Sequence, residues 1–217
     1  IISSTNENLL KIMVSNGVYD FVIDRSVYTE GDGILSIGYP VSLIGESRDG
    51  CKIIGGLQIE GEEEDNVYVK DLTLSDSYTN GVEGWHGASF HLDNVSVENS
   101  GGRGVSVRGT KRNTMKNCNV SHSTSSGLLL INSGLITIDG NGTTIHHNCT
   151  DGNNYDFGLD TLDSSTSIHL ASSLTIETIS KNNGGGGNYG GEGKIILLNK
   201  DGKVFYVLFD GTDEEDD

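Results

Sequence analysis

The chain has 217 residues, with 31 acidic residues against 14 basic ones and a formal net charge of −17 at neutral pH. Nucleic acids bind through clustered Lys and Arg side chains, so this charge argues against a nucleic acid as partner. Thirty-one glycines beside a single proline indicate many tight turns and exclude a collagen-like sequence. No stretch reaches the roughly 18 apolar residues that a membrane-spanning helix needs.

The N-terminal segment from Thr5 to Ser15 predicts a short amphipathic helix. It has a polar start followed by apolar residues at Leu9, Leu10, Ile12 and Met13. Such a helix would cap the open end of a stack of strands. Short apolar segments bounded by Gly, Asp or Ser then predict strands at residues 18–23, 34–37, 41–44, 51–54 and 57–59.

Three segments in the middle of the chain repeat with a period of 23 residues. They are Val69-Lys-Asp-Leu-Thr-Leu74, Leu92-Asp-Asn-Val-Ser-Val97 and Met115-Lys-Asn-Cys-Asn-Val120. A second element, Gly-Val or Gly-Leu at residues 81, 104 and 127, keeps the same step. Apolar residues alternate within each copy, which is typical of short strands with one buried face. Each repeat therefore predicts one coil of a parallel β-helix.

Stacking these coils gives columns of equivalent residues. The predicted inward column is apolar throughout: Val69, Leu92, Met115 and Ile138. The next, outward column alternates in sign: Lys70, Asp93, Lys116 and Asp139. Alternation avoids like charges on neighbouring strands and favours this register. After Asp139 the 23-residue spacing no longer holds: Ile145 corresponds to Val120 only if two residues are inserted.

The early segments Gly17-Val-Tyr19, Pro40-Val-Ser-Leu-Ile-Gly45 and Gly55-Gly-Leu-Gln-Ile-Glu-Gly61 support the same architecture. Together with the repeats they resemble right-handed parallel β-helix proteins of the pectin-lyase-like superfamily, over roughly residues 9 to 150. The resemblance implies an all-β, right-handed parallel β-helix. It selects no activity, because that superfamily holds lyases, hydrolases, epimerases, attachment proteins and adhesins.

The C-terminal part differs in composition. Residues 151–155 predict a loop, residues 167–170 and 174–179 predict strands, and the glycine-rich residues 181–193 predict a loop. Residues 195–198 and 204–209 flank Asp201-Gly202 and predict a β-hairpin, followed by an acidic tail at 213–217. We therefore expect a capped β-helix over residues 1–180 and a terminal region over residues 181–217.

A basic group with an aromatic neighbour is the candidate carbohydrate-binding site. Trp85 and Arg108 are 23 residues apart and should be neighbours on the outer face of adjacent coils. A tryptophan beside guanidinium groups suits a sugar ring and its carboxylate. In the plainer interpretation, Arg108 only stacks on Trp85 and the basic group offsets an acidic surface. The candidate residues are Trp85, His86, Arg103, Arg108, Lys111 and Arg112.

Catalytic and metal-binding motifs are weak. Asp160 and Asp163 are three residues apart, which in a strand places them on opposite faces. His146 and His147 should likewise point in opposite directions, so we expect no metal and no cofactor. Three cysteines, Cys51, Cys118 and Cys149, predict buried or unreactive thiols. Catalytic residues are not identified.

These observations favour a non-enzymatic structural or attachment module that binds partners along its sides or ends. The alternative is a polysaccharide lyase or epimerase. The expected partners are a further copy of the chain or a larger assembly, and a carbohydrate. Glycosylation sequons at Asn94, Asn119, Asn141 and Asn148 permit an extracellular or virion-surface location.

Overall fold

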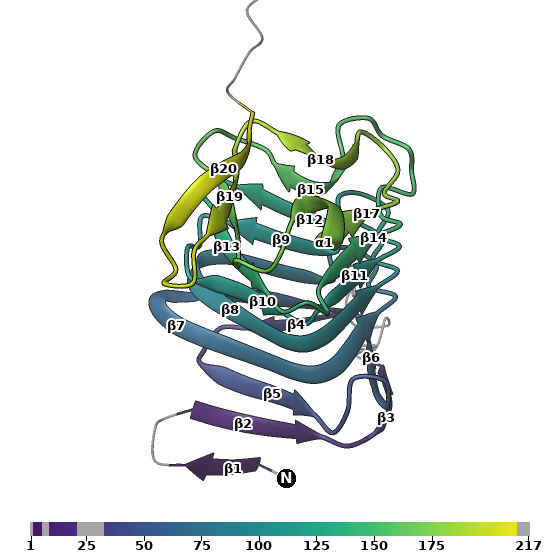
Figure 1. Ribbon diagram of the computed structural model, residues 1–217. Coiled ribbons are helices and arrows are strands. Elements are labelled where there is room, and N and C mark those ends of the chain that lie inside the picture. The colour runs from purple at the N-terminus through teal and green to yellow at the C-terminus, as the bar shows by residue number, and fades with distance from the viewer. Residues whose placement is uncertain (1, 6–8, 21–32, 212–217) are drawn as a thin grey trace, which may run out of the picture.

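The computed structural model describes residues 2–5, 9–20 and 33–211. Its chain winds through three parallel sheets, with coils of about 23 residues stacked along one axis (Figure 1). We call them sheets A, B and C, and the chain passes from C to A to B within each coil. The predicted β-helix is therefore confirmed.

Two long strands, β7 (Gly56–Ser75) and β8 (Val82–Glu98), bend through all three sheets. Sheet A also contains β2 (Leu9–Val14), β5 (Val41–Gly45), β10 (Asn113–Lys116), β13 (Leu135–Asp139), β16 (Ser167–Leu170) and β19 (Lys194–Leu198). Sheet B contains β3 (Gly17–Asp20), β6 (Cys51–Ile54), β11 (Asn119–Ser121), β14 (Thr144–His146) and β17 (Ser180–Lys181). Sheet C contains β4 (Ile34–Ile37), β9 (Val105–Arg108), β12 (Leu128–Ile131), β15 (Phe157–Thr161) and β18 (Gly187–Gly191).

The predicted inward columns form the core. Val69, Leu92, Met115 and Ile138 pair in register and are at most 1% exposed. Val82, Val105 and Leu128 form an equally buried column in sheet C. Apolar side chains stacked at strand spacing remove a continuous surface from water, and this burial is the main stabilising term of the solenoid.

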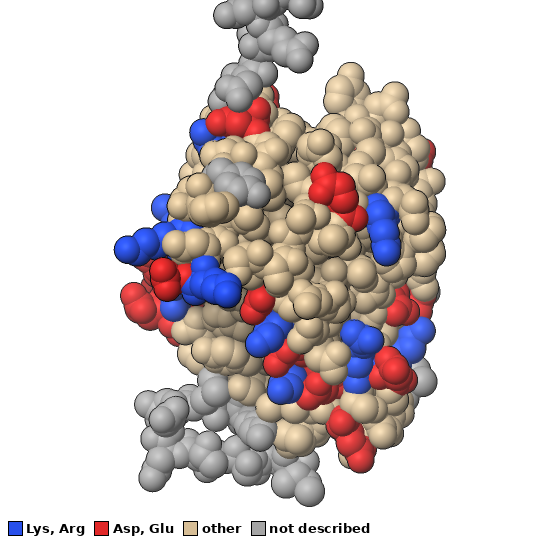
Figure 2. Space-filling model, in the orientation of Figure 1, with Lys and Arg blue, Asp and Glu red and all other residues tan. Residues whose placement is uncertain are grey.

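The outward charges also lie as expected. Lys70 Nζ is 3.3 Å from Asp93 Oδ2 on the next coil, and both side chains are partly exposed. Basic and acidic side chains lie beside one another over the lower coils in the view of Figure 2.

The corners of the coils depend on left-handed backbone conformations. Between sheets A and B, Asp71, Asn94 and Asn117 have φ values of 52 to 55°. Between sheets B and C the corresponding column has φ values of 55 to 59° and consists of Asp76, Asn99, His122, His147 and Asn182. Asn, Asp and His tolerate this conformation better than other non-glycine residues, which explains their recurrence at these corners.

The N-terminal helix prediction is wrong. Residues 2–5 form β1 (Ile2–Thr5) and residues 9–14 form β2, and the two strands pair antiparallel. β2 also pairs in parallel with β5, and Ile12 and Val14 pack against the core while Met13 is exposed. The sequence fits a helical stripe and a strand equally well, but a strand satisfies the hydrogen-bonding groups of the first coil.

At the C-terminus, the hairpin is confirmed. β19 pairs antiparallel with β20 (Val204–Asp210), and the connection from Asn199 is closed by the Gly202 N–H donating to the Asn199 carbonyl. Residues 174–179 do not form a strand. Residues 176–179 form α1 (Ile176–Ile179), and Thr175 caps the N-terminus of this helix through a capping box. The predicted glycine-rich loop contains strand β18. The acidic tail at 213–217 lies outside the described residues.

Candidate functional site

The candidate pocket lies where sheet C turns into sheet A. Gly84 pairs with Val107, so the next residues, Trp85 and Arg108, leave adjacent coils at the same corner. They line a pocket of about 400 Å³ together with His86, Gly87, Gly109 and Asn132. Three successive coils contribute to it, so the pocket depends on the stacking of the repeat.

Unusual backbone conformations support the aromatic wall of this pocket. The Trp85 and His86 ring centroids are 4.2 Å apart with an interplanar angle of 46°. His86 has φ of 55° and Gly87 has φ of 97°. A side chain on Gly87 would lie 2.9 Å from the Gly61 carbonyl oxygen on the previous coil. The turn therefore requires glycine at residue 87, and it presents the two rings side by side.

Arg108 is anchored by acidic and amide side chains of the outer face. Its Nε lies 2.7 Å from Glu83 Oε1. Glu83 Oε2 accepts a hydrogen bond from Asn80 Nδ2 at 3.2 Å, and Asn80 Oδ1 accepts one from the Arg103 backbone N–H at 3.0 Å. The Glu83 carboxylate therefore balances the charge of the guanidinium through an ion pair and holds it at this corner.

The remaining predicted site residues do not join the pocket. Arg112 donates to Asn66 Oδ1 at 3.2 Å and to the backbone carbonyls of Glu63 and Asp65, so it fastens the irregular stretch of β7 two coils earlier. Arg103 precedes β9, at the opposite end of that strand from Arg108, and Lys111 is exposed in the following turn. The structure thus brings together Trp85, His86 and Arg108 only.

A second polar cluster on sheet C was missed at the sequence level. Asp160 in β15 is 2% exposed, and its Oδ2 lies 2.7 Å from Ser126 Oγ. The same hydroxyl lies 3.0 Å from Asp156 Oδ1. A serine hydroxyl has one hydrogen, so it donates fully to only one of the two carboxyl groups at a time.

Burial of Asp160 shifts its protonation equilibrium. Burial raises its pKa from the usual 3.8 to about 6; the Ser126 hydrogen bond and the positive charge of Arg103 lower it, and Asp156 raises it further. Asp163 accepts hydrogen bonds from the Asn132 and Ser165 backbone N–H groups instead. No sequence signal marks the Asp156–Asp160 pair, because the long turn before β15 brings them together.

The prediction that His146 and His147 point apart is wrong. His147 occupies the left-handed corner, and its Nδ1 lies 2.7 Å from His146 Nδ1. His122, one coil earlier, stacks on His147 with centroids 5.4 Å apart. In the described part of the chain, no group of three or more His, Cys, Asp or Glu side chains converges as metal ligands would.

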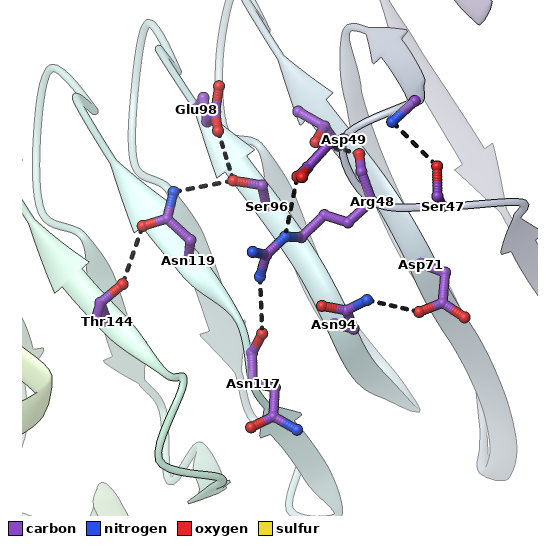
Figure 3. A network of polar contacts seen from close by, with 12 residues as sticks. Ser47, Arg48, Asp49, Asp71, Asn94, Ser96, Glu98, Asn117, Asn119 and Thr144 are labelled. Carbon is purple, nitrogen blue, oxygen red and sulfur yellow. Dashed lines mark hydrogen bonds and ion pairs between the residues drawn. The ribbon is translucent and has the colours of Figure 1, made fainter. Parts of the chain in front are cut away.

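The outer face of sheet B carries a hydrogen-bonded ladder (Figure 3). Thr144 Oγ1 donates to Asn119 Oδ1 at 3.1 Å, and Asn119 Nδ2 donates to Ser96 Oγ at 2.9 Å. Ser96 Oγ donates to Glu98 Oε1 at 2.6 Å. These groups satisfy one another along the coils, which identifies the ladder as a structural element.

The three cysteines are buried and free, as expected. Burial raises the pKa of Cys118 to about 11 and that of Cys149 to about 12, so both remain protonated thiols at neutral pH. Among the described helices, none is long and apolar enough to cross a membrane.

Comparison with known proteins agrees with this geometry. No curated protein and no solved structure matches the chain. A family model described as the right-handed beta helix region matches residues 55–201, which covers the coils that form both clusters on sheet C. The chain therefore belongs to the right-handed β-helix family.

Proposed function

We propose that this protein is a non-enzymatic attachment module that binds a saccharide on the outer side of sheet C. The observation that carries the proposal is the pocket of about 400 Å³ in which Trp85 and Arg108 stand together. An aromatic ring offers flat apolar area to the C–H face of a sugar, and guanidinium N–H groups donate to its oxygens.

The charge of the site selects a neutral saccharide. Glu83 balances Arg108 at 2.7 Å, so the pocket has no excess positive charge for a carboxylate. The chain as a whole carries −17, which repels a polyanion such as a polyuronate. Sugar hydroxyls need oriented donors rather than net charge, and Arg108 supplies them.

Calorimetric titration of neutral and uronate oligosaccharides tests the proposal. Neutral oligosaccharides should bind, and Trp85→Ala should weaken the affinity roughly tenfold or more. Tyr78→Ala is the matched control, because Tyr78 is 77% exposed in the turn at the other end of the sheet C strands. Equal affinities for wild type and Trp85→Ala would refute the site.

A lyase or epimerase is the second candidate, favoured by the near-neutral pKa of Asp160. The argument against it is burial: a carboxyl group that is 2% exposed does not reach a polysaccharide. Incubation with uronate oligosaccharides, followed by the absorbance of unsaturated products, separates the candidates. Turnover that disappears in Arg108→Ala or Asp160→Asn would establish the enzyme.

We also propose that the module associates with a further copy of itself through β20. Val204, Phe205 and Val207 on this terminal strand are 59%, 65% and 45% exposed, an apolar group at one end of the solenoid. Light scattering coupled to size exclusion should find a dimer or larger species that Val207→Lys dissociates. Met13→Lys, at the opposite end, is the control, and a monomeric wild type would contradict the proposal.

A further inference from the structure

The corner between sheets B and C carries three histidines that the proposed saccharide site does not use. His146 lies on the outward side of β14, His147 follows it at the corner, and His122 occupies the same corner one coil earlier. His122 and His147 are exposed and His146 is half-buried. Solvent therefore reaches this histidine cluster.

The contact between His146 and His147 is the feature that points to a ligand. Their Nδ1 atoms are 2.7 Å apart, with rings nearly perpendicular at 89°. Between two neutral imidazoles this contact requires one Nδ1–H and one Nδ1 lone pair, so the two nitrogens share a single proton. Without that proton, both lone pairs face the same small space.

A metal ion that replaces the shared proton would lie to one side of the line joining the two Nδ1 atoms, because their separation of 2.7 Å is shorter than two metal–nitrogen bonds. Imidazole nitrogens bind divalent transition metals at about 2.0–2.1 Å, so two cis ligands of a square arrangement are about 3 Å apart. Tetrahedral ligands are wider apart, at about 3.3 Å. The observed 2.7 Å is closer to the square arrangement, which Cu²⁺ and Ni²⁺ prefer.

His122 does not complete this set. Its ring is parallel to that of His147 within 6°, so its lone pair lies in a plane beside the shared space. This agrees with the lack of any convergent group of three or more such side chains in the described residues. The remaining coordination positions would face solvent and be filled by water or by a ligand from outside.

We propose that the Nδ1 atoms of His146 and His147 form a two-histidine binding site for Cu²⁺ or Ni²⁺ at the corner between sheets B and C. The charged groups that face His146 are Lys181 on β17, Glu98 on β8, and the two other histidines. Protons compete for the same nitrogens, so metal affinity should fall as the pH is lowered.

The chain itself supplies conservative replacements for the test. Asn99 and Asn182 occupy the corner position of His147 on other coils, so His147→Asn preserves the left-handed turn. Ser121 pairs with His146 as its outward neighbour on the coil before, so His146→Ser preserves the strand. Both variants should fold as the wild type does.

The experiment is a Cu²⁺ titration of the intact protein at neutral pH, followed by calorimetry and by electron paramagnetic resonance. Wild type should bind one equivalent with a spectrum of nitrogen coordination. His147→Asn and His146→Ser should each weaken binding roughly tenfold or more, and the double variant should lose the nitrogen signature. His122→Asn and His169→Gln should leave the affinity within about threefold of wild type.

Three outcomes would overturn the proposal. The first is no saturable binding in wild type up to millimolar Cu²⁺. The second is a nitrogen-coordinated site that persists in the double variant, which would place the metal elsewhere. The third is an equal loss in His122→Asn, which would mean that the ring stacking seen here is not the metal-binding geometry.

Discussion

The outer faces of sheets B and C are built on the same core but differ in how their polar groups are satisfied. On sheet B, Ser96, Asn119 and Thr144 bond to one another from coil to coil. On sheet C, Trp85 Nε1, Arg103 Nε and Ser106 Oγ are buried with no hydrogen-bond partner, although among described residues such atoms also occur elsewhere. A buried polar group without a partner costs free energy, and such costs concentrate at functional sites.

This difference between the two faces indicates which part of a solenoid can bind a ligand. Where the repeat is regular, polar side chains stack on adjacent coils and can satisfy one another by hydrogen bonds. Sheet C departs from repetition: its outward column reads Glu83, Ser106, Leu129 and Asp160. Ser106, Leu129 and Asp160 are at most 2% exposed, so a ligand would reach sheet C at the pocket lined by Trp85 and Arg108.

Sheets B and C share one hydrophobic core, and disrupting that core should have the largest effect on stability. Leu92→Asp would place an unpaired charge in a column that is 1% exposed, and should unfold the protein or abolish soluble expression. Asp93→Asn, the outward neighbour, should cost at most ~1 kcal/mol. Thermal melts of the two variants provide the measurement; equal melting temperatures would mean that the faces are reversed.

Asp160→Asn should raise stability at high pH. The pKa of Asp160 is about 6 in the folded protein and 3.8 as the ordinary value, so the folded state keeps a proton that the unfolded state loses between these pH values. Stability therefore falls as the pH rises from about 4 to 6, by at most ~3 kcal/mol. The variant removes this cost and should exceed wild type at pH near 8.

Urea unfolding of Asp160→Asn at several pH values provides the measurement, with Asp163→Asn as the control of opposite sign. Burial alone would raise the Asp163 pKa, but hydrogen bonds from Ser165 and Asn132 lower it overall. Stability supplied by Asp163 is thus present at neutral pH and lost as the pH falls through its folded pKa. A pH-independent difference for Asp160→Asn would show that its carboxyl group titrates normally.

Breaking the sheet B ladder should have a smaller effect. Asn119→Leu removes the bonds to Ser96 and Thr144. It should lower the free energy of unfolding by ~1 kcal/mol, because half-buried Thr144 regains water and buried Ser96 keeps its bond to Glu98. Lys116→Gln, an exposed position on the preceding strand, should change it little. If Asn119→Leu were as stable as wild type, the ladder would not be a stabilising element.

The smallest expected effect concerns glycosylation, which should not change stability. In a secretory host, the folded protein should carry a glycan at Asn141 alone, because its side chain is exposed. The amide nitrogens of Asn94, Asn119 and Asn148 donate to Asp71, Ser96 and the Val120 carbonyl. Mass spectrometry of the secreted protein gives the answer, with Asn141→Gln as the unglycosylated control; a glycan on buried Asn148 would contradict this fold.

The sequence by itself determined the coil. The 23-residue step and its alternating apolar residues specify which side chains face inward, because a one-residue slip would expose the whole column. Leu92, Met115 and Asp93 therefore took their predicted places. The same step brought Trp85 beside Arg108, since equal positions on adjacent coils become neighbours.

Only the tertiary structure decided where the repeat is interrupted. The N-terminal segment became β2 because β5 offered a pairing partner far along the chain, which local periodicity does not reveal. The long turn before β15 places Asp156 close to Asp160, and the Ser126 hydroxyl contacts both carboxyl groups. A left-handed corner turns His147 toward His146, where a straight strand would have separated them. Each case depends on contacts between distant segments or on a local φ angle, and neither follows from the spacing of residues alone.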